Sequence, residues 1–128
     1  MAVMELTQDD FEPTIQNNDI VIIDFWAPWC APCRAFAPTF EAAAGNHPDI
    51  VFSKVNTEEQ QGLAAAFQIR SIPTLMIFRE QVILFSQPGM LSAGQLEDVI
   101  GKVREIDMAQ VHEDVRRQQA EQAPATSE

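Results

Sequence analysis

The chain of 128 residues is predicted to fold as an α/β domain in which a mixed β-sheet carries helices on both faces. Apolar runs rich in β-branched residues alternate with segments of helical periodicity. Strand–helix–strand units in the first half imply parallel pairing, because parallel strands need a long crossover. Two apolar runs separated only by residues 79–81 imply an antiparallel hairpin near the end of the sheet.

The individual elements follow from periodicity and from capping signals at the helix ends. Thr7, Thr57 and Ser92 each place a side-chain oxygen where the first turn of a helix would need one. Gly45 is expected to end the second helix. The expected order is a short strand near 3–6, a helix over 8–18, strand 19–26, helix 30–44, strand 49–55, a short helix over 58–67, strands 74–78 and 82–86, and a final helix that begins after Ser92.

Beyond this final helix the chain carries a further segment with helical character. Asp107 is a possible N-cap, and Met108, Val111 and Val115 recur at helical spacing after it. Either the final helix continues into solvent, or a separate amphipathic helix docks on the body, on a second copy or on a partner. So narrow a stripe contributes only a few kcal/mol and is expected to tune partner choice. The expected division is a folded domain over 1–106, an amphipathic helical extension over 107–119 and a disordered tail over 120–128.

Charge and composition exclude several classes of function. The chain has 19 acidic and 8 basic residues, for a net charge of −11, which repels phosphate backbones and argues against nucleic-acid binding. No apolar run approaches the roughly 18 residues that a membrane span requires. The acidic N-terminus shows no secretory signal, so a cytoplasmic location is expected. Glycine-rich dinucleotide and phosphate loops are missing, so no bound cofactor is expected.

The two cysteines, Cys30 and Cys33, stand in the motif WCAPC and allow three interpretations. A zinc site needs about four ligands, and His47 and His112 are not paired at ligand spacing, so no metal site is expected. A structural disulfide would close a very small loop and stabilise the fold little. Inert buried thiols would not explain the tryptophans and prolines around the motif.

A redox-active dithiol fits the local physics of this motif best. Cys30 is expected to be exposed where a buried strand ends and a helix begins, and free N–H groups with the helix dipole lower a thiol pKa there. Cys33 lies one turn further on the same helix face, within bonding reach. Pro32 is tolerated in the first turn because its missing N–H has no helical partner.

The sequence resembles the thioredoxin family over about residues 4–105. The likeness is carried by VIIDFWAPWCAPCR (21–34), IRSIPTLMIF (69–78) and SQPGMLSAGQLEDVI (86–100), in that order along the chain. This resemblance implies the thioredoxin fold, a mixed five-stranded sheet flanked by four helices, and it makes residues 1–106 a thioredoxin domain. The fold agrees with the order of elements above.

The resemblance also implies a protein-disulfide reductase and a role for each catalytic residue. Cys30 would attack a target disulfide, and Cys33 would resolve the resulting mixed disulfide. Asp24 matches the family's buried carboxylate beneath the dithiol, where burial should raise its pKa and suit proton exchange with Cys33. Lys54 matches a lysine near that carboxylate in some relatives.

The target groove is implied by the same resemblance. Pro73 matches the family's cis-proline, which would leave the backbone of Ile72 free to pair with an extended target segment. Trp29 and Gly89 correspond to the other walls of that groove. These four residues are the expected substrate-binding set.

Ala31 and Pro32 replace the usual Gly-Pro between the cysteines and are expected to tune the redox potential. Oxidising relatives carry a histidine there that stabilises the thiolate, so its absence favours a reductase. Electrons are expected from an NADPH-dependent flavoprotein, thioredoxin reductase, and disulfide-containing proteins are the expected targets. The alternatives are a thioredoxin-like binding subunit or holdase, and an oxidase or isomerase.

Overall fold

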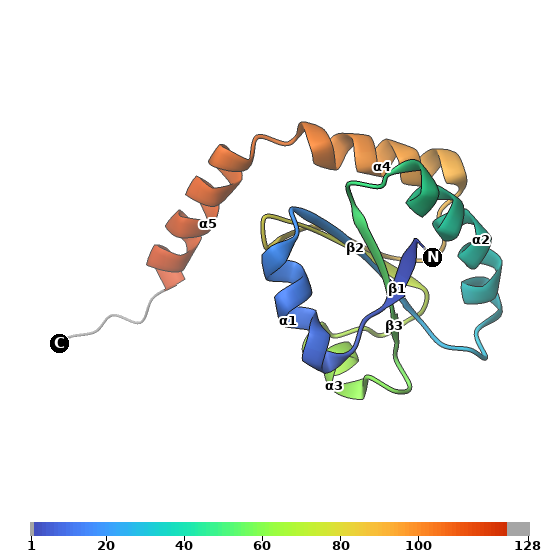
Figure 1. The fold of residues 1–128 in the computed structure, drawn as a ribbon. Coiled ribbons are helices and arrows are strands. Elements are labelled where there is room, and N and C mark those ends of the chain that lie inside the picture. The colour runs from blue at the N-terminus through green and yellow to red at the C-terminus, as the bar shows by residue number, and fades with distance from the viewer. Residues whose placement is uncertain (1, 123–128) are drawn as a thin grey trace.

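The computed structural model describes residues 2–122 as one five-stranded sheet with helices around it (Figure 1). The elements in chain order are β1 (Val3–Glu5), α1 (Gln8–Asn17), β2 (Ile20–Trp26), α2 (Ala31–Asn46), β3 (Val51–Asn56), α3 (Gln61–Ala66), β4 (Thr74–Arg79), β5 (Val82–Pro88), α4 (Ala93–Glu105) and α5 (Met108–Gln122). Within these residues, no helix is long and apolar enough to cross a membrane.

The strand order is β1-β3-β2-β4-β5, which confirms the predicted mixed sheet. β1 and β2 pair in parallel with β3, while β4 runs antiparallel to β2 and to β5. The central strand β2 is buried along nearly its whole length, as its continuous apolar run predicts. The order places the end of β2 beside the start of β4, and the functional residues come from these two strand ends.

Helices cover both faces of the sheet (Figure 1). On one face, Ile20 and Ile22 of β2 join a core cluster with side chains of α2 and α4, such as Phe36 and Leu96. On the other face, alternate β2 residues join a second cluster with α1 and α3. Asp24 has the same parity as Ile22, so its side chain belongs to the face that α2 covers.

Capping at the first and last predicted helices is confirmed, and two other helix boundaries were predicted wrongly. Thr7 accepts a hydrogen bond from the backbone of the first turn of α1, and Ser92 forms a full capping box with Gln95. Thr57 does not cap α3: its hydroxyl donates to the carbonyl of Trp26 at 3.1 Å, and the helix begins only at Gln61.

The end of α2 also differs from the prediction. Gly45 lies inside the helix, which continues to Asn46 and ends at the C-cap residue His47. His47 is held in place by side-chain contacts, because its ring lies 2.8 Å from Glu97 and 3.0 Å from Arg104 and stacks on Phe52. These tertiary contacts extend the helix past the glycine.

The β4–β5 connection is a two-residue turn formed by Glu80 and Gln81, both at positive φ (51° and 71°). Such turns match the twist of a hairpin but favour glycine or asparagine. Glu80 is used for contacts instead: its carboxylate lies 2.7 Å from the ring of His112 in α5. Arg79, the last residue of β4, donates to the carbonyls of Val103 and Ile106 at 2.9 and 3.1 Å.

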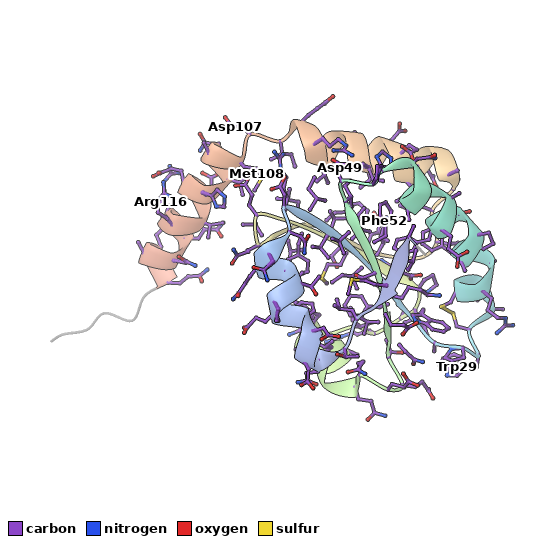
Figure 2. All side chains as sticks on the ribbon, viewed as in Figure 1. Trp29, Asp49, Phe52, Asp107, Met108 and Arg116 are labelled. Carbon is purple, nitrogen blue, oxygen red and sulfur yellow. A yellow bond between two sulfur atoms is a disulfide. The ribbon has the colours of Figure 1, made fainter. Side chains whose placement is uncertain are left out.

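The helical extension forms a separate helix, α5, whereas its docking on the body, on a second copy or on a partner stays a prediction. Asp107 caps α5 by accepting a hydrogen bond from the backbone N–H of Gln110 at 3.2 Å. Met108 is buried, whereas most of the later residues of α5 are exposed, and the helix extends away from the sheet (Figure 2). α5 continues to Gln122, past the expected end at residue 119. The remainder of the expected tail, residues 123–128, lies outside the described residues.

Candidate active site

Cys30 and Cys33 form a disulfide at the N-terminus of α2, with their Cα atoms 5.2 Å apart. Cys30 is the N-cap of the helix, and its Sγ accepts a hydrogen bond from the backbone N–H of Cys33 at 3.2 Å. The sulfur thus takes the place that a capping oxygen usually occupies. A pair that forms a disulfide on the first turn of a helix can also exist as a dithiol, so the site can exchange two electrons.

The predicted exposure of Cys30 is wrong, because this residue is only 4% exposed. Cys33 is 2% exposed, and the pair forms a small apolar cluster with Ala27, against which Trp26 and Ile72 pack. The cluster encloses both sulfurs, since the strand end and the loop before β4 meet above the helix N-terminus.

Ala31 and Pro32 occupy the first turn of α2, and both side chains are exposed. Pro32 has no N–H to leave unpaired, as expected at this position. The turn before them is fixed by Arg34, whose guanidinium donates to the carbonyl of Pro28 at 2.8 Å. Arg34 therefore ties the start of the helix to the loop that follows β2.

The loop before β4 faces the disulfide. The Ile72–Pro73 peptide bond is cis, as the resemblance implied. The carbonyl oxygen of Ile72 lies 3.7 Å from the Sγ of Cys30, a contact between atoms without a donor, because a disulfide sulfur carries no proton. Gly89, at φ +97°, donates its N–H to the carbonyl of Pro73 at 2.8 Å, and only glycine adopts that backbone conformation freely.

Trp29 is the most exposed large apolar side chain of the site, at 64%, and it lies at the surface next to the disulfide (Figure 2). Its indole N–H donates to the carboxylate of Glu58 at 2.8 Å. The sequence interpretation missed Glu58, since it lies 29 residues away in the loop after β3 and carries no local motif. The hydrogen bond fixes one edge of an exposed ring and places a negative charge beside it.

Asp24 is buried in the middle of β2, at 1% exposure, and neither carboxylate oxygen has a hydrogen-bond partner among the described residues. Burial raises its pKa from 3.8 to about 7, and the positive charge of Lys54 offsets part of that rise. Asp24 shares its face of the strand with Ile22, which packs under α2, and with Trp26, which packs against the disulfide cluster. The carboxyl therefore lies beneath the start of α2.

Lys54 stands opposite Asp24 in the parallel pairing of β2 and β3. Its Nζ lies 4.1 Å from the centre of the Trp26 ring, close enough for a cation–π interaction. The ammonium group of Lys54 thus contacts the ring of Trp26 and forms no direct salt bridge with Asp24. Within residues 2–122, no cluster of three ligand-type side chains could hold a metal ion.

Comparisons with known proteins agree with this geometry. The sequence model of the family described as Thioredoxin matches residues 2–102. A Streptomyces coelicolor protein named "Putative thioredoxin 2" is 53% identical over 120 residues, which are 94% of this chain and 90% of that protein. The Haemophilus influenzae thioredoxin is 36% identical over 102 residues, 78% of this chain and 95% of that protein. A solved mutant thioredoxin from Halobacterium salinarum has a TM-score of 0.76 and 29% identity, and the match covers 82% of this chain and 93% of that one.

These matches differ in how much of the chain they cover. The match to the Streptomyces coelicolor protein spans 120 of the 128 residues, so it includes most of α5. The match to the Haemophilus influenzae protein uses nearly all of that shorter chain and leaves more than a fifth of this one uncovered. The sequence of the helical extension is therefore largely covered by the match to the Streptomyces coelicolor protein.

Proposed function

This chain belongs to the thioredoxin family and reduces protein disulfides through Cys30 and Cys33, and from that premise we propose how the residues around the pair contribute. The observation that carries the proposal is the placement of the disulfide. It caps a helix N-terminus, faces the cis-proline loop and lies above a buried carboxyl.

In the reduced protein, the Cys30 thiolate attacks one sulfur of a target disulfide. The target's S–S bond breaks, its second sulfur leaves as a thiolate, and a mixed disulfide forms with Cys30. The Cys33 thiolate then attacks the Cys30 sulfur, which releases the target's first sulfur and restores the Cys30–Cys33 disulfide. Two electrons and two protons pass to the target. The N–H of Cys33 that now points at the Cys30 sulfur would stabilise the attacking thiolate.

Asp24 is proposed to act as the proton acceptor for Cys33. A pKa of about 7 leaves the carboxyl half protonated near neutral pH, so the same group can accept a proton in one step and return it in another. Its burial on the face of β2 beneath α2 supports this role. Lys54 limits the rise in that pKa and thereby keeps the group in the useful range.

The target is proposed to lie along Ile72 as an extended segment. None of the backbone hydrogen bonds among residues 2–122 uses the N–H of Ile72, and its carbonyl faces only the Cys30 sulfur. An extended chain could therefore pair with this residue as an added strand. Trp29 on one side and Gly89 on the other form the walls, with Ala31 and Pro32 exposed between them and tuning the potential of the disulfide.

The source of electrons is proposed to be an NADPH-dependent flavoprotein, thioredoxin reductase, in the cytoplasm. The disulfide must be reduced after each turnover, and the described residues include only this one redox pair. The partner must therefore carry the hydride chemistry. Its natural targets are proteins with accessible disulfides, and the acidic surface favours neither nucleic acid nor anionic membranes.

Insulin reduction with a supplied thioredoxin reductase and NADPH tests this assignment. The wild-type protein is expected to catalyse it, Cys30→Ser to abolish it, and Cys33→Ser to accumulate a mixed disulfide visible by non-reducing mass spectrometry. Ala31→Gly serves as a matched control that keeps both thiols and should change the midpoint potential without abolishing turnover. Equal accumulation of mixed disulfides by the two serine variants would contradict the assigned order of attack.

A further inference from the structure

Next to the cis-proline loop, the surface carries a hollow that the exchange chemistry does not use. Three segments form it: the α3–β4 connection, the first residue of β4 and the last part of β5. Its lining includes Gln68, Arg70, Ser71, Thr74, Ser86 and Pro88.

The hollow adjoins the groove in which we propose that the target lies. Thr74 and Pro88, which line the hollow, are paired across β4 and β5. The neighbouring residues Pro73 and Gly89 are joined by a backbone hydrogen bond at the wall of the groove. Arg70 precedes Ile72 by two residues along the same loop. A target segment lying on Ile72 would therefore pass the mouth of the hollow within a few residues of its cysteine, at about 3.3 Å per residue of extended chain.

The chemistry of the hollow differs from that of the rest of the molecule. Within residues 2–122, Arg70 is the only ionic residue that lines the hollow, together with Ser71 and Ser86. The hydroxyl of Thr74 already donates to the carbonyl of Ser71 at 2.6 Å. Among residues 2–122, no carboxylate lines the hollow, although the chain has 19 acidic residues. None of the ion pairs within residues 2–122 involves Arg70. An exposed guanidinium in a hollow that two serine side chains also line is suited to a carboxylate.

We propose that this hollow is a side-chain subsite that accepts an acidic residue of the target, located within about three residues of the target's disulfide cysteine. The proposal rests on the function above, because it requires the target to lie along Ile72. It adds a charge preference at one position of the target sequence. Elsewhere along the target, the net charge of −11 disfavours acidic residues.

The test is a positional scan with disulfide-linked peptide dimers, in which one residue near the cysteine is glutamate, glutamine or lysine. The reduced protein transfers two electrons to each dimer, which yields two peptide thiols and the oxidised protein. The rate of thiol release is measured by chromatography at low and at high salt. At one position glutamate is expected to react about three- to fivefold faster than lysine, the size of one exposed ion pair, and high salt should remove the difference. At the other positions, dimers with lysine are expected to react faster than dimers with glutamate.

Variants at Arg70 and at Lys102 distinguish the effect of the hollow from the effect of the protein's overall charge. Arg70→Gln should abolish the glutamate preference at that position, and Arg70→Glu should reverse it. Lys102→Gln makes the same change in net charge on exposed α4 and should keep the preference. The proposal is wrong if rates follow only the net charge of the peptide, or if Lys102→Gln and Arg70→Gln behave alike. Failure of the wild-type protein to reduce any dimer would instead overturn the proposed function.

Discussion

Replacing Asp24 with asparagine is expected to stabilise the oxidised protein at about pH 8 and to change little at about pH 3.5. The carboxyl is 1% exposed and has no hydrogen-bond partner among the described residues. Burial raises its pKa from 3.8 to about 7, so between these values the folded protein holds a proton that the unfolded chain has released. Stability therefore falls as the pH rises through this window, because the folded state binds more protons.

The size of the effect follows from the two pKa values. Below about pH 3.8 the carboxyl is neutral in both states and carries no charge penalty, whereas above about pH 7 it is ionised in both states and the penalty is complete. At about 1.4 kcal/mol per tenfold change, the difference amounts to about 4 kcal/mol. Asparagine keeps a neutral buried group at every pH, so the gain in free energy of unfolding should grow from near zero to about 4 kcal/mol.

Guanidinium unfolding across this pH range measures the prediction. Wild type and Asp24→Asn should differ by an amount that rises sigmoidally with pH, while Asp98→Asn, an exposed acid on α4, should follow the wild type. Two parallel curves for wild type and Asp24→Asn would refute the reasoning, since the carboxyl would then be solvated in the folded state.

Asp24→Asn should also slow release of the mixed disulfide near neutral pH, where proton transfer from Cys33 is required.

Two further predictions concern residues at opposite ends of the molecule. Glu58→Ala should lower insulin-reduction efficiency about two- to fivefold, because Trp29 loses a charged hydrogen-bond partner worth about 1 kcal/mol. Glu58→Gln keeps a hydrogen-bond acceptor and should retain most of the wild-type efficiency. Equal rates for both variants would show that the hydrogen bond is not used. Deletion of residues 107–128 should leave that efficiency unchanged and lower the melting temperature by about 10 °C, because the buried Met108 contributes about 2 kcal/mol. A loss of activity would place α5 in the groove.

Local patterns were enough to predict much of the fold. The capping signals at Thr7 and Ser92 depend only on residues within one turn, and both are confirmed. The wrong predictions at Thr57 and Gly45 have a common cause. In each case a contact with a segment distant in sequence determined the helix boundary. Thr57 donates to the carbonyl of Trp26, and His47, two residues after Gly45, contacts side chains of α4 and β3.

The same distinction applies to the site. The WCAPC motif and the cis-proline loop are contiguous segments, so their residues could be named from the sequence. Glu58 could not be, because its partner Trp29 lies on a different loop. The burial of Cys30 also depends on the fold, since Ile72 approaches it from a loop more than forty residues later.

The unusual residues of the β4–β5 turn are linked to the C-terminal extension. Two-residue hairpin turns favour Asn-Gly, whereas this chain places Glu80 in a positive-φ conformation that disfavours it. Glu80 instead contacts His112 of α5, and its neighbour Arg79 binds carbonyls at the end of α4, including that of the junction residue Ile106. Arginine at a helix C-terminus satisfies carbonyls that have no helical partner. The turn thus fixes where α4 ends and the direction in which α5 begins, far from Trp29 and the disulfide (Figure 2). Asn-Gly in this two-residue turn would suit the hairpin better, but it would remove the Glu80–His112 contact that orients the extension.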